Sequence, residues 1–400
     1  MSNPDLAQET LDYIVDFLQG KPEALKACCL VSKSWVTRTR KHLFASILLR
    51  SADDLKMWKA AFPDPSNSPA HYTQALLVCS QAVPGADVEA GDLIRTFSRI
   101  TRLDMAVELD LGTSLAPFRG ISPILKSLRV YTFILFPQVF DLIPSFPLLE
   151  DLALTGSNYS LGNGDDQQGP ETIAPSTSPP LTGCLDLLVK GMEYPTRRLM
   201  DLPNGIHFRK LILLWLEEDD FRWIMELVMR CSDTLECLDI RCTPHGTFVP
   251  VLRRNYNLPL FVAEVSPAPI DLSKAMTLRD VVFRPGSLKI AWITLALQTI
   301  TPKHRDIRRV SISVPGALTP ANAAASVELN VGDEISSQWL DLDRLFVKLW
   351  EPHKIRPKVV YTVQEEKDKH ARRRLECLLP EMTKRGIIDL VEQSEPHQIL

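Results

Sequence analysis

A short apolar pattern recurs along this chain of 400 residues and constrains its fold more than any other feature. The pattern is apolar-x-x-apolar-x-apolar, and its instances are Phe44/Ile47/Leu49, Tyr72/Ala75/Leu77, Ile100/Leu103/Met105, Leu125/Leu128/Val130, Leu149/Leu152/Leu154, Phe208/Leu211/Leu213, Leu235/Leu238/Ile240, Leu278/Val281/Phe283, Ile307/Val310/Ile312 and Leu342/Leu345/Val347. The middle residues from Ile47 to Leu152 are 28, 28, 25 and 24 positions apart, and Leu211 and Leu238 are 27 apart. Such regular spacing indicates a structural repeat that contributes one strand per unit.

Helix-forming stretches stand between several of these strands, for example "DDFRWIMELVMRC" and "KIAWITLALQTIT". A strand-and-helix unit cannot bury its apolar face alone, so stacked neighbours share one core and curve into an arc. We expect a parallel strand ladder on the concave side and helices on the convex side. Because apolar triplets also arise by chance in a leucine-rich α/β protein, a non-solenoid α/β domain is the alternative.

The beginning of the chain has another pattern, with three short helix-forming segments in residues 6–45. The apolar residues that recur at three-and-four spacing on the first helix are Leu11, Ile14, Val15 and Leu18. Gly20 is a natural helix stop, and Trp35 opens the third apolar group. So small a unit gains too little apolar burial to offset its chain entropy, and we expect it to lean on a neighbour or a partner.

This block resembles an F-box, in the F-box-like form common among fungal proteins. The matching residues are Leu6, Glu9, Leu11, Ile14, Phe17, Leu18, Leu25, Cys28, Leu30, Val31, Lys33, Trp35, Leu43 and Phe44. Ala7 stands where the family usually has proline, and Asp5 with Gln8 three residues later offers a substitute capping box. A plain helical cap is the alternative, because apolar helical spacing alone is common.

The resemblance implies that the block docks a Skp-type adaptor and, through it, a cullin scaffold. The residues that it assigns to the adaptor contact are Leu6, Ala7, Glu9, Ile14, Leu18, Leu25, Leu30 and Val31. Trp35 is expected to pack the small core instead.

The remainder of the chain is similar to the divergent leucine-rich-repeat region found behind many F-boxes. The expected fold class is therefore α/β, with a three-helix domain at 1–45 and an irregular leucine-rich-repeat solenoid at 46–400. The solenoid is expected to be irregular because the asparagine ladder of standard repeats is largely missing. Residues 157–180 are rich in Gly, Pro, Ser and Asp and are expected to form a flexible insertion.

Side chains alternate along a strand, so the residues between the apolar positions are expected to face the concave side and bind a target. These candidates are Arg102, Asp104, Arg129, Tyr131, Asp239, Arg241, Arg284, Arg309, Arg344, Phe346 and Lys348. Mixed charge with interspersed aromatic side chains is typical of surfaces that bind proteins.

No catalytic motif stands out, and we expect neither an enzyme nor a bound cofactor or metal. Cys231, Cys237, Cys242 and His245 have zinc-ligand chemistry, but they lack the paired spacing of a zinc site. "EEDD" at 217–220 is interpreted as favourable charge at a helix N-terminus. "KDKHARRR" at 367–374 is interpreted as the polar face of a helix, with a nuclear signal as the alternative.

The formal net charge is only −4, so nucleic acid is not an expected partner. The opening residues "MSNPDLAQET" resemble no signal peptide and no apolar run is long enough to span a bilayer, which favours a protein of the cytoplasm or nucleus away from membranes. The expected function is substrate recognition for an SCF-type (Skp-cullin-F-box) E3 ubiquitin ligase. A ligase-independent leucine-rich-repeat scaffold or sensor is the alternative.

Overall fold

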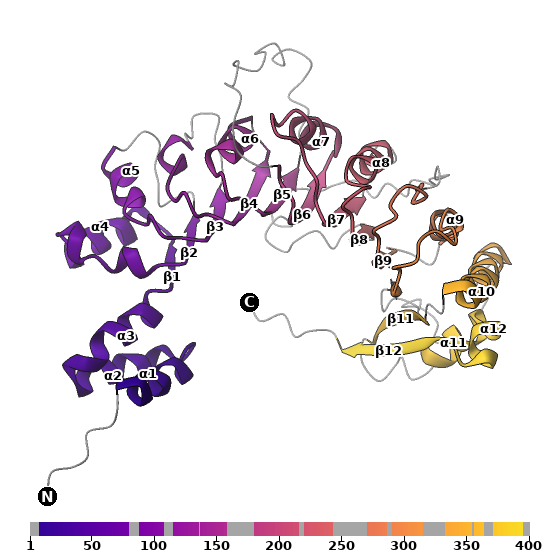
Figure 1. Ribbon diagram of the computed structural model, residues 1–400, viewed down its shortest axis with the longest axis horizontal. Helices are drawn as coiled ribbons and strands as arrows, with labels where there is room; N and C mark the ends of the chain where they lie inside the picture. The colour runs from indigo at the N-terminus through magenta and orange to yellow at the C-terminus, as the bar shows by residue number, and fades with distance from the viewer. Residues whose placement is uncertain are drawn as a thin grey trace, which may run out of the picture. The chain divides into compact units, whose positions relative to one another are not determined.

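The computed structural model describes residues 8–79, 88–107, 115–135, 137–157, 180–215, 220–242, 270–285, 290–314, 333–353, 356–363 and 371–394 (Figure 1). Its internal contacts divide the chain into two compact units. Unit 1 comprises Met1–Leu181 and Leu202–Asn204, and unit 2 comprises Thr182–Asp201 and Gly205–Leu400. The two units are described one after the other.

Unit 1 begins with a block of three helices, which are α1 (Gln8–Phe17), α2 (Pro22–Val31) and α3 (Lys33–Leu43). Five strands follow, namely β1 (Ser46–Leu49), β2 (Ala75–Cys79), β3 (Arg102–Val107), β4 (Ser127–Ile134) and β5 (Asp151–Ser157). Between them lie α4 (Ala52–Ala61), α5 (Val88–Arg95) and α6 (Pro137–Leu142), together with short 3₁₀ turns. Each strand pairs in parallel with the next one along the chain.

Unit 2 continues the same alternation of strand and helix. Its strands are β6 (Cys184–Lys190), β7 (Lys210–Trp215), β8 (Cys237–Cys242), β9 (Asp280–Arg284), β10 (Arg309–Val314), β11 (Arg356–Val363) and β12 (Asp389–Ser394). Its helices are α7 (Glu193–Met200), α8 (Asp220–Arg230), α9 (Ala291–Gln298), α10 (Asp333–His353), α11 (Ala371–Leu378) and α12 (Pro380–Arg385). The strands again pair in parallel in chain order.

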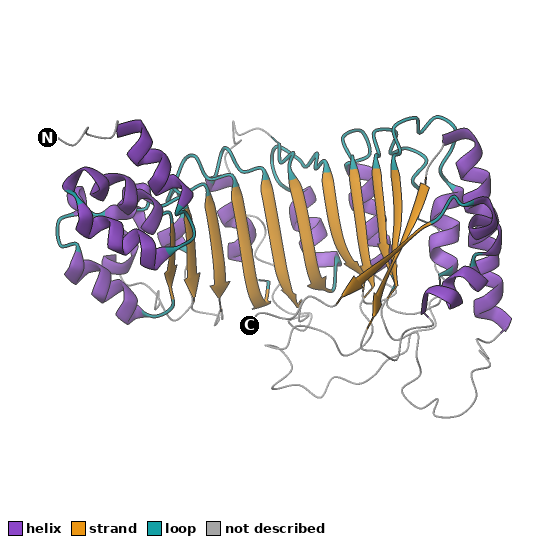
Figure 2. Ribbon diagram, turned by 90° about the horizontal axis from the view of Figure 1, so that it is seen from below, coloured by secondary structure: helices purple, strands orange, loops and turns teal. Residues whose placement is uncertain are grey.

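The apolar pattern explains this arrangement. Leu103 pairs with Leu128 and Met105 with Val130 along the ladder of unit 1, and all four side chains are buried. Within each unit the helices cover one face of the strands (Figures 1 and 2). Because side chains alternate between the two faces of a strand, the buried apolar residues share one face. The opposite face carries the alternate side chains, and no helix of the described residues covers it. Both units therefore have one apolar core layer and one open strand face.

Backbone hydrogen bonds also join the turns that precede successive strands. In unit 1 the amide of Thr101 donates to the carbonyl of Gln74 at 2.8 Å, and the amide of Lys126 donates to Thr101 at 2.8 Å. In unit 2 the amide of Glu236 donates to Arg209, and that of Arg279 donates to Glu236, both at 2.8 Å. Because the same bond recurs before successive strands, each turn enters its strand in the same register.

Side chains from one repeat also cap the helix start of a neighbouring one. In unit 2 Asp220 Oδ1 accepts from the Met192 amide at 2.7 Å, and Gln338 Oε1 accepts from the Ile290 amide at 2.9 Å. The buried Asp343 accepts from the amides of Glu381 and Met382, at the start of α12, at 2.8 and 2.9 Å. These contacts satisfy amides that a helix leaves without an internal partner.

The expected α/β architecture of parallel strands and helices is confirmed within each unit, and eight of the ten apolar triplets match strands in the expected register. The second triplet is one residue out of register, because Leu76 and Val78 are the buried residues of β2. The tenth is wrong, since Leu342, Leu345 and Val347 belong to α10. The pattern missed β6, β11 and β12. Almost all of the expected insertion at 157–180 lies outside the described residues.

Candidate functional site

The three-helix block has a small core, to which α1 contributes Val15 and α2 contributes Leu25 and Cys28. Its local signals are clear: Gly20 takes a positive φ of 83° between α1 and α2, and Pro22 opens α2. The side chain of Ser32 caps α3 by accepting from the Ser34 amide at 3.3 Å. Three buried apolar residues are a small core for three helices. The other apolar side chains of the block that the structure describes are half-buried or exposed.

Large apolar side chains stand exposed on α1 and at the end of α2. Leu30 is 89% exposed and Phe17 is 73% exposed, and Tyr13 and Val31 are exposed to a similar degree. Ile14 lies between these extremes and the core. Exposed apolar side chains in such number on a small unit are typical of a surface that another molecule covers. We call Tyr13, Ile14, Phe17, Leu30 and Val31 the apolar surface of the block.

A polar clamp joins α1 to α3 within the block. Asp16 Oδ1 accepts from Arg38 Nε at 2.6 Å and lies 2.6 Å from His42 Nε2, while Asp16 Oδ2 accepts from Arg38 Nη2. The hydrogen bonds from Arg38 and then His42 hold the pKa of the Asp16 carboxyl well below its usual range. The clamp holds α1 and α3 at a defined angle. The small core alone constrains this angle only weakly.

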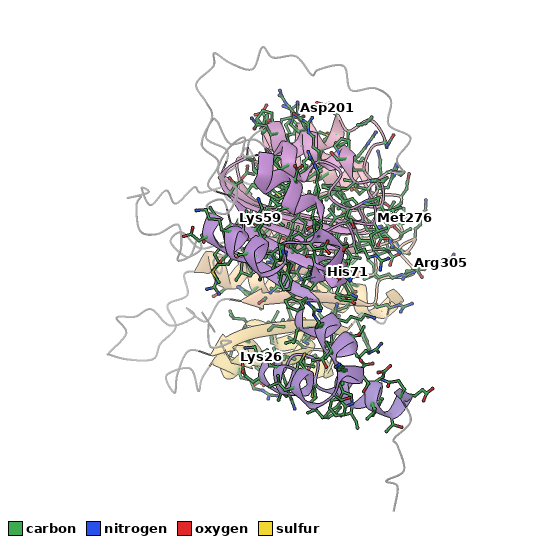
Figure 3. All side chains as sticks on the ribbon, turned by 90° about the vertical axis from the view of Figure 1, so that its left-hand side faces the viewer. Lys26, Lys59, His71, Asp201, Met276 and Arg305 are labelled. Carbon is green, nitrogen blue, oxygen red and sulfur yellow. The ribbon has the colours of Figure 1, made fainter. Side chains whose placement is uncertain are left out.

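The block is fastened to the first repeat of unit 1 by aromatic side chains. The ring of Phe44 meets those of Trp58 and Phe62 edge-on, with both pairs of centroids 5.9 Å apart. Trp58 in turn contacts the buried Phe97 at 5.3 Å. Figure 3 shows Lys26 on the block and Lys59 on α4, the helix that carries Trp58. Phe44, directly after the last residue of α3, thus packs against the first repeat and connects the block to it.

The residues assigned to an adaptor contact do not all lie on one surface. Ile14, Leu30 and Val31 lie in the apolar surface. Glu9 is exposed, and Leu18, which follows Phe17, is half-buried. Leu25 is only 2% exposed and belongs to the core of the block, which does not fit its assignment as a contact residue. Leu6 and Ala7, and with them the substitute cap at Asp5, lie outside the described residues. Trp35 is half-buried.

The open strand face of unit 1 carries four of the expected target-binding residues. Arg102 grips the buried Asp104 with Nε at 2.9 and 3.1 Å and Nη2 at 2.6 Å. The hydrogen bonds that Arg102 donates to Asp104 raise the pKa of the Arg102 guanidinium. Arg129 lies beside Asp104 on the next strand, and the exposed Tyr131 lies two residues further along. These side chains form one charged and aromatic cluster.

The open strand face of unit 2 brings together three more. Asp239, only 5% exposed, accepts from Arg241 on its own strand and from Arg284 on β9. Arg309, on β10, forms a separate ion pair with Asp280 at 3.1 Å. These residues therefore lie on the open strand face, where the buried Asp239 anchors Arg241 and Arg284 while the partly exposed Asp280 pairs with Arg309.

Arg344, Phe346 and Lys348 are not part of a strand face, which corrects the assignment of these three. They lie on the 21-residue helix α10, where Phe346 is buried and the other two are exposed. Trp339, Leu342, Phe346 and Leu349 are spaced three and four residues apart, which places them on one face of a helix. The strand pattern found in this segment is therefore a coincidence of its apolar residues.

Neither a scan against protein-family models nor a search of curated proteins finds a match to this chain. The assignment of the site therefore depends on the residues themselves. Among the described residues, no group of three or more His, Cys, Asp or Glu side chains could hold a metal ion. Of the cysteine group singled out for zinc, burial raises the pKa of Cys231 to about 11, and His245 lies outside the described residues. Among the residues that the structure describes, no helical segment combines the length and the apolar composition needed to span a bilayer.

Sequence reasoning missed Tyr13 and left Phe17 out of the contact set. Both lie away from the face of α1 that buries Val15, at positions where a soluble helix usually places polar residues. Large aromatic residues on the polar side of a helix were the available signal.

Proposed function

We propose that the protein is the substrate-recognition adaptor of an SCF-type E3 ubiquitin ligase. The observation that supports this most is the apolar surface of the three-helix block, whose side chains stand exposed on α1 and α2 beside a core of few residues. The resemblance of this block to an F-box names the partner, a Skp-type adaptor that connects to a cullin scaffold.

The energetics of the apolar surface favour a stable complex. Removal of apolar area from water contributes about 25 cal/mol per Å², and aromatic residues at the centre of an interface carry most of the binding energy. Phe17 and Tyr13 offer two such anchors, and Leu30 and Val31 add aliphatic area. The Asp16 clamp keeps α1 in place before a partner arrives, which lowers the ordering cost of binding.

The repeats supply the second half of the proposed function. Their open strand faces carry charged and aromatic side chains. Buried aspartates hold Arg102 and Arg284 in place, and such preordered arginines suit capture of a target protein. We interpret these strand-and-helix repeats as a divergent leucine-rich-repeat region. A target held near the transferring enzyme reacts at a high effective concentration, so the adaptor itself needs no catalytic residue.

The test is co-purification of the full chain with a Skp-type adaptor. We expect the wild type to co-elute with the adaptor, and Leu30→Asp and Phe17→Asp to weaken binding by at least about a hundredfold, because each places a charge in an apolar interface. Met57→Asp is the matched control: Met57 is 69% exposed on α4, outside the block, and its substitution should leave co-elution unchanged. Circular dichroism checks that all variants stay folded.

A ligase-independent scaffold or sensor is the second candidate, and the aromatic contacts of Phe44 favour it, since they fit helices that only cap the ladder. Absence of co-elution by the folded wild type would exclude the ligase proposal and leave this one. Equal binding by wild type and Leu30→Asp would exclude the assigned surface.

A further inference from the structure

Two arginines in unit 2 stand opposite each other and share one carboxylate. Arg241 on β8 and Arg284 on β9 are register partners, so their backbones lie one strand spacing apart, about 4.8 Å. Arg284 Nε donates to Asp239 Oδ1 at 3.1 Å and Oδ2 at 3.2 Å, and Arg241 Nη2 donates to Oδ2 at 3.3 Å. We call Asp239, Arg241 and Arg284 the two-arginine cluster.

The cluster carries more positive than negative charge. One carboxylate faces two guanidinium groups, and like charges directly opposite each other on neighbouring strands repel. In the described part of the chain the Nη groups of Arg284 donate to no acceptor, and the buried Nε of Arg241 also lacks one. A second anion would therefore relieve the repulsion and occupy donors that are already in place.

The other ion pairs of the open faces are balanced. Arg309 pairs with Asp280 in unit 2, and Arg102 holds Asp104 through three hydrogen bonds in unit 1. Neither aspartate accepts a second arginine among the described residues. Arg129 is the register partner of Asp104 but donates no hydrogen bond to it, so among the described residues the two-arginine cluster differs from these pairs in that two arginines share one carboxylate.

The strand residues that pair directly with the cluster are apolar, while the basic Lys210 lies two residues before Ile212 on β7. Ile212 on β7 and Val282 on β9 are the register partners of Asp239, and Leu214 is the register partner of Arg241. A polyanion such as nucleic acid requires a row of basic residues along its backbone, which these neighbours do not provide. One anionic group flanked by apolar groups is instead the chemistry of a peptide.

From this geometry we infer that the two-arginine cluster binds a single side-chain oxyanion, a carboxylate or a phosphate, presented by a peptide segment of the target protein. Arg241 and Arg284 donate to its oxygens, Asp239 holds both guanidinium groups in place, and Ile212 and Val282 contact the neighbouring apolar residue of the peptide. This inference rests on the proposed function, because it names the chemical class of target that the open face of unit 2 selects.

The test uses the full chain and a peptide library with a degenerate sequence around one central residue, which is serine, glutamate or phosphoserine in three separate pools. We expect the wild type to enrich the glutamate or the phosphoserine pool over the serine pool by at least about tenfold. The pool that is enriched identifies carboxylate or phosphate as the preferred group. Equal recovery of all three pools overturns the inference.

Variants assign the effect to the cluster. Arg284→Ala should bring the enrichment close to one, and Arg284→Lys should leave part of it, because lysine keeps the charge but loses the planar fork. Arg305→Ala is the matched control, since Arg305 is an exposed arginine in the turn before β10 that belongs neither to the cluster nor to the target-binding residues, and it should retain the wild-type enrichment. Enrichment that survives in folded Arg284→Ala overturns the inference.

The outcome can be separated from that of the proposed function. Arg284→Ala should still co-elute with the Skp-type adaptor, and Leu30→Asp should still enrich the anionic pools. Anionic selection without adaptor binding would remove the ligase role and keep the cluster as a peptide site.

Discussion

The three-helix block and the strands of unit 1 that follow it use apolar side chains in opposite ways. The block exposes Phe17 and Leu30 almost completely, whereas Leu103 and Met105 on β3 have no exposed surface. Both regions have apolar residues at regular spacing. In the ladder, each strand-and-helix repeat packs its apolar residues against the next repeat, whereas the block is not a repeat and, among the described residues, has no such neighbour on its apolar surface. A repeat therefore completes its core from within the chain, whereas the block leaves large apolar side chains exposed, and this exposure is the basis of the proposed adaptor surface.

The charged residues show the reverse distribution. In the block, Asp16, Arg38 and His42 form a clamp that joins α1 to α3. On the strand faces of both units the charged groups are turned toward the open side and are held by buried aspartates. Charged side chains therefore join helices within the block but lie on the open face of the ladder, whereas apolar side chains are exposed on the block and buried in the ladder.

The largest effect on stability is expected from a core residue of the repeats. Phe283 on β9 is fully buried and meets the ring of Trp292 edge-on at a centroid distance of 5.2 Å. Phe283→Ala should lower the free energy of unfolding by about 3–5 kcal/mol, because it removes the transfer energy of the ring and leaves a cavity. Denaturant titration followed by circular dichroism measures the change.

The control for this substitution is Met276→Ala in the turn before β9. Met276 is exposed, and the change should stay within about 0.5 kcal/mol. A loss for Phe283→Ala no larger than that of the control would show that the ladder does not depend on its apolar layer.

A smaller effect is expected from the core of the block. Leu25→Ala should cost about 2–3 kcal/mol, at the low end for a buried leucine, because so small a core collapses readily around the cavity. The loss should be confined to α1, α2 and α3, and hydrogen exchange resolved by peptide can show this. Leu30→Ala, in the same helix but exposed, should leave exchange unchanged. Faster exchange over β1–β5 in Leu25→Ala would contradict the separation of block and ladder.

Much of the ladder could be predicted from the sequence, and the strands that escaped prediction have physical reasons. The pattern finds a strand when all three apolar positions are filled, as in Leu125, Leu128 and Val130. It misses β6 because Thr182 occupies the first position before Leu185 and Leu187. At residues 342–347 the same letters suit a helix, and only the neighbouring Trp339 and Leu349 reveal the helical period.

The candidate surfaces were harder to predict than the fold. Leu25 and Leu30 are both leucines of α2, yet one is core and the other is almost fully exposed. Their difference depends on the angle at which α1 and α3 cross α2, which no local pattern contains. The open faces fared better, since strand alternation alone separates Arg102 and Asp104 from Leu103. The sharing of Asp239 by two arginines depends on strand register and needed the structure.

The smallest expected effect is a dependence of the block on pH. Hydrogen bonds from Arg38 and His42 lower the pKa of Asp16 below its unfolded value of about 3.9, so the clamp stabilises the block above that pH and is lost on acidification toward the folded value. Hydrogen exchange corrected for its intrinsic pH dependence should therefore show α1 and α3 opening below about pH 4 before the strands of unit 1 do. Asp16→Asn should open them at neutral pH and flatten this dependence, whereas Asp53→Asn, which breaks only an exposed pair with Lys56 on α4, should behave as the wild type. Identical pH profiles for wild type and Asp16→Asn would show that the core, and not the clamp, orients the helices.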